Sequence, residues 1–172
     1  GEEVEGSPVV HATRRLYAEA VAAERARAGG GAILATGHLH CAGCLESEGA
    51  ERRILVGGEH AVPHDIFSAD LAYVALGHLH QPQEVGRRAV RYSGSLFPLS
   101  ATELGYRHGI TLVDIAPGRT ETEHLPIDRP VPCIRLPERG ASPLAALDAA
   151  LEAMRLDPDC PRSRQPFVHA VV

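Results

Sequence analysis

Two short apolar segments that end in nearly the same polar sequence constrain the fold of this chain most. Ala-Ile-Leu-Ala at 32–35 leads into Thr-Gly-His-Leu-His, and Leu-Ala-Tyr-Val-Ala-Leu at 71–76 leads into Gly-His-Leu-His. Short apolar runs bounded by glycine are typical of buried strands. In α/β folds, the loops beyond strand ends are where functional sites are usually found. The pattern therefore predicts an α/β fold with both histidine clusters in loops just beyond the ends of strands.

The rest of the chain predicts two units of different design. A segment rich in Ala, Arg and Glu at 9–28 stops at three glycines and predicts a helix. After the second histidine cluster the pattern changes to strand-strand, and three prolines within 126–132 indicate a linker. We expect one domain over 1–125 and the beginning of a second, smaller α+β domain over 126–172. The remaining predicted elements are strands at 53–56, 89–92, 110–115, 120–125 and 133–136, with the third and fourth forming a hairpin, a helix opening at Ser142-Pro143, and a buried strand within 167–172.

Length and composition exclude several classes of protein. The 172 residues suffice for one domain or slightly more, and the apolar runs fall far short of the ~20 residues of a membrane-spanning helix. Net charge is -5, so any contact with nucleic acid must come from a local basic patch. Four cysteines without a secretory signal favour a reducing cytoplasm. The chain starts without methionine and ends on a predicted core strand, so we expect it to be part of a longer protein.

Three of the ten histidines share a context that suits metal binding. His38 follows one glycine, and His78 and His80 follow another at positions i and i+2, where both side chains can face one site. Imidazole is the commonest neutral metal ligand, and the glycines let a loop approach a metal closely. The alternative is that these histidines are ordinary polar loop residues or half-buried side chains with satisfied hydrogen bonds.

The same residues carry a resemblance to a known family. The segments ATGHLH, ALGHLHQPQ and VRYSGS, together with HGITLVDI, resemble the SbcD family of bacterial exonuclease subunits, which are calcineurin-like metallophosphoesterases. The resemblance runs from about residue 32 to residue 115. It implies the C-terminal half of a four-layer α/β metallophosphoesterase sandwich, followed by the start of a capping domain.

The resemblance also implies a site with two metal ions, usually manganese. His38 and His78 match ligands of one ion, and His80 matches a ligand of the other. Two ions ~3.5–4 Å apart can hold both the attacking water and the scissile phosphate. The family's earlier motifs, an Asp-x-His pair, a bridging Asp and a Gly-Asn-His segment with the catalytic Asn-His dyad, have no counterpart, because no Asp-x-His occurs and asparagine is absent. We therefore expect no catalytic residue in this chain and no activity from it alone.

By resemblance, the whole protein would be a DNA exonuclease and endonuclease that processes double-strand breaks and hairpins. Its implied partners are an SbcC-like ATPase, DNA and a second copy of itself, and its implied location is the cytoplasm, in association with the nucleoid. Two alternatives stay open. One is a metallophosphoesterase that acts on another phosphoester, and the other is a non-catalytic module that binds DNA or a protein partner.

Two further clusters are candidates for binding. The segment 87–95 is the one local cluster of arginines with hydroxyls beside it, and its position after the metal ligands suggests that Arg91, Ser93 and Ser95 bind DNA phosphates. Cys41 and Cys44 follow His40 with zinc-like spacing, but a closed zinc site needs a fourth ligand that the surrounding sequence does not supply. We expect these two cysteines to be ordinary small thiols.

Overall fold

The computed structural model describes residues 7–47 and 61–172, and its centre is a four-stranded sheet. The strand order is β1-β2-β4-β3, with β1 (Ile33–His38), β2 (Leu71–Gly77) and β4 (Arg87–Tyr92) parallel. The edge strand β3 (Gln83–Val85) pairs antiparallel with β4. The strands predicted from the two apolar segments are thereby confirmed, whereas the strand predicted at 53–56 lies outside the described residues.

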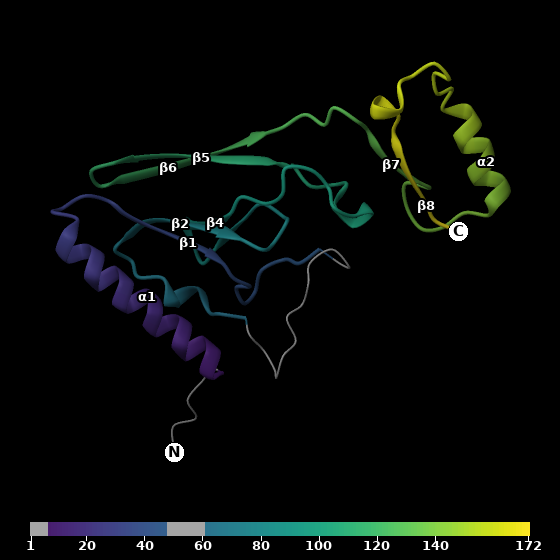
Figure 1. The fold of residues 1–172 in the computed structure, drawn as a ribbon. Helices are drawn as coiled ribbons and strands as arrows, with labels where there is room; N and C mark the ends of the chain where they lie inside the picture. Colours follow the sequence, from purple (N-terminus) through teal and green to yellow (C-terminus); the bar gives the residue numbers. More distant parts are fainter. Residues whose placement is uncertain (1–6, 48–60) are drawn as a thin grey trace.

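The helix α1 (Pro8–Arg27) lies along one side of this sheet (Figure 1). It begins after Ser7, whose hydroxyl accepts the N–H of Val10, and Pro8 fits its first turn because that turn has N–H groups without intrahelical partners. Two valines of the helix join side chains of the sheet and its connections in one buried apolar core. Its members are Val10, Val21, Cys41, Val62, Ile66, Phe67, Leu71, Val74, Leu76, Leu79, Val85, Val90 and Tyr92.

A long antiparallel hairpin covers the opposite side of the sheet (Figure 1). Strands β5 (Gly109–Ala116) and β6 (Arg119–Pro126) pair in continuous register, and β6 contacts β2 and β4. The turn between them contains Gly118 at φ +71°, a conformation that glycine adopts without strain. The predicted hairpin is confirmed, and the arrangement of helix, mixed sheet and hairpin places the chain in the α/β class.

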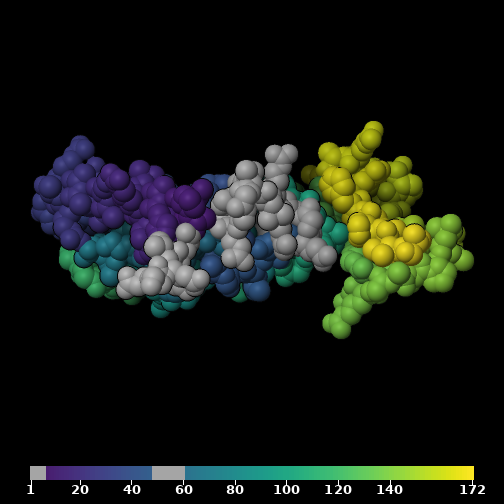
Figure 2. Space-filling view, turned by 90° about the horizontal axis from the view of Figure 1, so that it is seen from below, coloured from purple at the N-terminus to yellow at the C-terminus, as the bar shows by residue number. Residues whose placement is uncertain are grey.

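The remaining elements form a lobe at one end of the molecule (Figures 1 and 2). Strand β7 (Cys133–Leu136) pairs in parallel with β8 (Phe167–Ala170), and α2 (Leu144–Ala153) connects them. The prediction of a buried strand within 167–172 is wrong in one respect, because the Phe167 side chain is 71% exposed. Among the described residues β8 pairs with β7 alone, so its apolar side chains have little to pack against. The domain boundary expected at 125/126 stays a prediction.

Three one-turn helices complete the described elements: η1 (His64–Ile66), η2 (Ala101–Glu103) and η3 (Arg162–Arg164). Within the two described ranges, no helix combines the length and the apolar character that crossing a membrane requires.

Candidate metal centre

The parallel strands bring the predicted histidines to one edge of the sheet. His38 pairs with Gly77 at the ends of β1 and β2, and Tyr92 ends β4 beside Leu76. One detail of the prediction is wrong: His38 is the last residue of β1 and does not lie in a loop beyond it. The pairing with β2 continues through Thr36 and Gly37, so the strand extends to the histidine.

The imidazoles of His38 and His78 lie edge to face, with ring centroids 5.3 Å apart and planes inclined by 70°. Glycine at position 77 makes room for this arrangement, because a Cβ there would lie 3.0 Å from Nδ1 of His38. A third imidazole, that of His40, stands 5.9 Å from the ring of His78 and contacts Glu46 at 3.1 Å. The two histidines that were predicted to share one metal ion therefore lie together.

The backbone at His78 is strained. Its φ of 105° falls where side chains other than glycine are rare, and such strain concentrates at functional sites in proteins. The next residue, Leu79, is buried in the core and fixes the loop immediately after β2. Packing of Leu79 therefore holds the segment that carries His78 and His80 in an otherwise unfavourable conformation.

His80 contacts a fully buried carboxylate. Its Nδ1 lies 2.7 Å from Oε1 of Glu103, whereas the imidazole itself is 19% exposed. The second oxygen of Glu103 accepts the backbone N–H of Leu99 at 2.8 Å. Sequence reasoning missed Glu103, because no motif marks it and 23 residues separate it from His80.

The three residues predicted to bind DNA phosphates have partners within the protein. Arg91 pairs with Glu84 across strands β3 and β4, and its side chain is 15% exposed. The Ser93 hydroxyl accepts the Thr111 N–H at 2.9 Å, which ties the end of β4 to the hairpin. The Ser95 hydroxyl lies 3.1 Å from Nδ1 of His108. The prediction that these residues bind phosphate stays a prediction.

The donor set at this edge fits part of a metal centre. Nδ1 of His80 is held by a carboxylate, which is the arrangement that orients metal-binding histidines in proteins. Within residues 7–47 and 61–172, however, no three histidine, cysteine or acidic side chains are placed so that they could hold one ion. The described residues therefore fit a contribution to a metal centre and do not make up a whole one.

The cysteine pair lies apart from any such role in the described structure. Cys41 is fully buried in the core, and its backbone N–H donates to the Tyr92 hydroxyl at 2.9 Å. Burial, and to a smaller extent the neighbouring Cys41, raises the pKa of the Cys44 thiol to about 11. Metal-binding and reactive cysteines need the thiolate, which this environment disfavours.

Of the histidines without a predicted role, His108 has a structural one. It is buried, and its Nε2 lies 3.0 Å from the backbone carbonyl of Glu103. His64 packs under Gly86, and Nε2 of His124 lies 2.7 Å from the carbonyl of Arg107. His60 lies outside the described residues.

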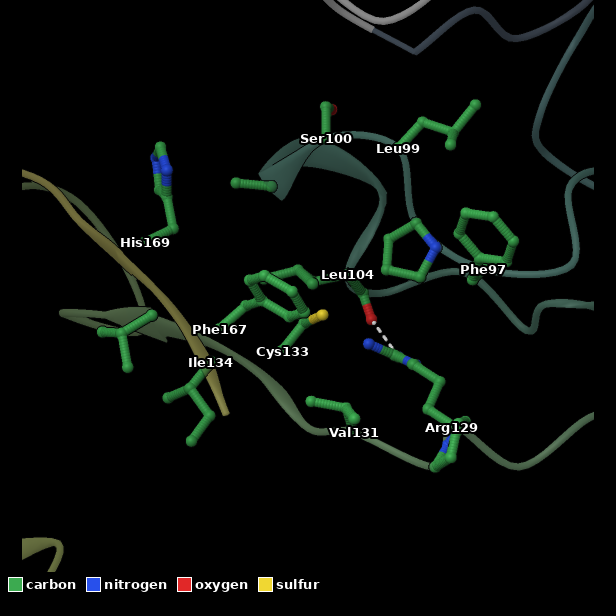
Figure 3. A pocket seen from close by; sticks show the side chains of 14 residues that line it. Phe97, Leu99, Ser100, Leu104, Arg129, Val131, Cys133, Ile134, Phe167 and His169 are labelled. Atoms are coloured by element: carbon green, nitrogen blue, oxygen red, sulfur yellow. Dashed lines mark hydrogen bonds between the residues drawn. The ribbon is translucent and has the colours of Figure 1, made fainter. Parts of the chain in front are cut away.

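An apolar pocket of about 480 Å³ separates the C-terminal lobe from the loop after β4 (Figure 3). Phe97, Leu104 and Phe167 line it, and Arg129 closes one side by donating to the carbonyl of Leu104 at 3.0 Å. Leu99 and Ser100 line it too, so the pocket wall and the turn that carries Glu103 are the same segment.

Comparison with known proteins gives relatives along almost the whole chain. The SbcD subunit of the SbcCD nuclease of Rhodobacter capsulatus is 54% identical over 168 residues, which are 98% of this chain and 41% of that protein. Proteins of the same name are 37% identical over 72% of the chain in Escherichia coli and 44% identical over 52% of it in Bacillus subtilis, where the matches cover 30% and 23% of those proteins. No protein-family model matches the chain.

The fold and the sheet edge define an α/β protein whose parallel strands carry histidines at their carboxyl ends. The chain belongs to the SbcD family of nuclease subunits, as the resemblance of its GHLH segments predicted. It spans about two fifths of the length of its Rhodobacter relative.

Proposed function

We propose that this chain supplies His38, His78 and His80 as metal ligands to a DNA nuclease that hydrolyses phosphodiester bonds. The observation that carries the proposal is the meeting of these residues at the carboxyl edge of the parallel strands, in a chain related to nuclease subunits. Manganese is the ion that we propose, and imidazole is one of the ligand types that such ions accept.

Two bound ions would activate a water and stabilise the charge that develops on the phosphate oxygens. The chain's own residues have simpler parts. His38 and His78 present two imidazoles from adjacent strands, and the strained backbone at His78 sets the direction of the second one. His80 presents a third imidazole, whose orientation is fixed by Glu103.

We propose that the chain alone is inactive. The described residues bring no three donors together, and the sequence has neither an Asp-x-His pair nor any asparagine. Since the relatives are longer proteins, the remaining ligands and the catalytic Asn-His dyad would come from a region that these 172 residues do not contain.

We further propose that the whole protein acts on DNA with an SbcC-like ATPase, as a homodimer in the nucleoid-associated cytoplasm. The relatives' name, which designates one subunit of an SbcCD nuclease, supports an ATPase partner. A DNA strand along the loop after β4 would exchange with the present partners of Arg91, Ser93 and Ser95, namely Glu84, Thr111 and His108.

A chimera tests the proposed function. This chain replaces the matching segment of the Rhodobacter protein, and cleavage of linear duplex DNA is measured with manganese. We expect cleavage by the chimera, and a fall to background with His38→Ala, His78→Ala or His80→Ala. The control is His11→Ala, because His11 is exposed on α1 and far along the chain from the sheet edge.

Three results would contradict parts of the proposal. Cleavage that survives all three histidine substitutions would remove them as ligands. Cleavage by the 172-residue chain alone, abolished by His78→Ala, would show that the chain needs no further ligands. Hydrolysis of small phosphoesters without cleavage of DNA would favour a metallophosphoesterase with another substrate.

A further inference from the structure

Glu103 is the one charged side chain in the described structure that is fully buried, and its surroundings explain how it tolerates burial. A buried carboxylate is costly unless donors surround it. One oxygen accepts the Leu99 N–H, and the other lies 2.7 Å from Nδ1 of His80, a distance typical of a charge-assisted hydrogen bond. An ionised carboxylate only accepts hydrogen bonds, so the proton between them belongs to Nδ1 of His80.

The turn that carries Glu103 is itself held firmly. Ser100 begins η2, and its hydroxyl accepts the N–H of Thr102 at 3.2 Å. The carbonyl of Glu103 accepts the N–H of Tyr106 at 2.9 Å and lies 3.0 Å from Nε2 of His108. The backbone of Glu103 is thus fixed independently of its side chain.

These contacts close into a ring of hydrogen bonds. His80 contacts Glu103 through its side chain, and His108 donates from Nε2 to the carbonyl of Glu103, because a carbonyl only accepts. With that proton on Nε2, the Ser95 hydroxyl donates to Nδ1 of His108. The N–H of Ser95 in turn donates to the carbonyl of His80 at 3.0 Å. The loop after β2 and the loop after β4 are therefore locked together around His80.

We propose that Glu103 is a positioning residue for the metal centre, because its carboxylate keeps the proton of His80 on Nδ1 and so keeps the lone pair on Nε2, the nitrogen that would coordinate the metal. The inference rests on the proposed function for the metal itself, but the position of the proton is a property of the metal-free chain. Carboxylates that hold metal-binding histidines in this way affect metal affinity without touching the ion.

The substitution Glu103→Gln tests this sharply. In the wild-type protein both oxygens of Glu103 accept hydrogen bonds, whereas a glutamine has one acceptor and one NH₂ donor. If the amide oxygen keeps the Leu99 N–H, the NH₂ group must face Nδ1 of His80, which then has to accept. The proton of His80 moves to Nε2, and the nitrogen needed for the metal is blocked.

The first readout is the tautomer of His80 in the metal-free, full 172-residue chain, measured by nitrogen-15 NMR of the imidazole and assigned with His80→Gln. We expect the proton on Nδ1 in the wild type and on Nε2 in Glu103→Gln. The matched control is Glu84→Gln, which alters a carboxylate that pairs with Arg91, and it should leave the His80 signal unchanged. The wild-type spectrum decides the matter even if the variant fails to fold, because a proton on Nε2 would overturn the inference.

The second readout is manganese affinity of the chimera described above, measured by the electron paramagnetic resonance of free manganese. We expect Glu103→Gln to weaken binding about 10- to 100-fold. An unchanged affinity, while His80→Ala still abolishes binding, would overturn the role of Glu103 and leave the proposed function intact. No effect of His80→Ala on binding would instead contradict the proposed function, and the wild-type tautomer would still report on the hydrogen bond.

Discussion

The hydroxyl of Tyr92 connects the end of β4 to the segment after β1, and its removal provides a quantitative test of the structure. The residue is fully buried, and burial raises the pKa of its hydroxyl, which therefore stays protonated and can donate. It donates to the carbonyl of Leu39 and accepts the N–H of Cys41 at 2.9 Å. These two backbone groups flank His40 and lie directly after His38.

Tyr92→Phe keeps the ring and removes both hydrogen bonds. A buried backbone group left without a partner costs about 1–3 kcal/mol. The N–H of Cys41 is fully buried and the carbonyl of Leu39 partly so, and we expect the free energy of unfolding to fall by about 2–4 kcal/mol. Urea denaturation, followed by circular dichroism, measures the change.

Tyr73→Phe is the matched control for this prediction. Tyr73 lies on the neighbouring strand β2 and is also buried, but its hydroxyl makes no hydrogen bond within the described part of the chain. Its loss should cost less than about 1 kcal/mol. Equal effects of the two substitutions, or a loss below about 1 kcal/mol for Tyr92→Phe, would refute the connection between β4 and the segment after β1.

Two further predictions concern a glycine and a thiol. Gly94 has φ +82° and an added Cβ would lie 2.7 Å from the carbonyl of His80, so Gly94→Ala should destabilise the protein by more than the ~1–2 kcal/mol of a left-handed alanine. Gly118→Ala has a similar φ and open space, so equal urea midpoints for the two variants would contradict the close approach. Because the pKa of Cys44 is about 11, alkylation at pH 8 should be about 100-fold slower than for an ordinary exposed thiol and should accelerate about tenfold per pH unit up to about pH 10. The folded state also keeps this proton to higher pH than the unfolded state, so the free energy of unfolding should fall as pH rises toward about 11; fast alkylation at about pH 8 would contradict the burial.

Local patterns in the sequence predicted the elements well. The glycines at 29–31 ended the first helix within one residue of the prediction, because a helix stops where left-handed backbone is easy. The turn at Gly118 and the alternating strands on either side predicted the hairpin. Exposure of β8 was not predictable in this way, because an apolar strand looks the same in sequence whether or not a partner covers it.

The sequence by itself determined which residues stand at the candidate metal centre: His38, His78 and His80 follow apolar strands, and a parallel sheet carries the ends of such strands to one edge. Only the tertiary structure decided what holds them there. The carboxylate of Glu103 comes from a turn 23 residues beyond His80, and the hydroxyl of Tyr92 comes from a strand 51 residues beyond Cys41. No periodicity or spacing encodes such contacts, because they arise when the loops after β1, β2 and β4 pack together and buried polar groups must find partners.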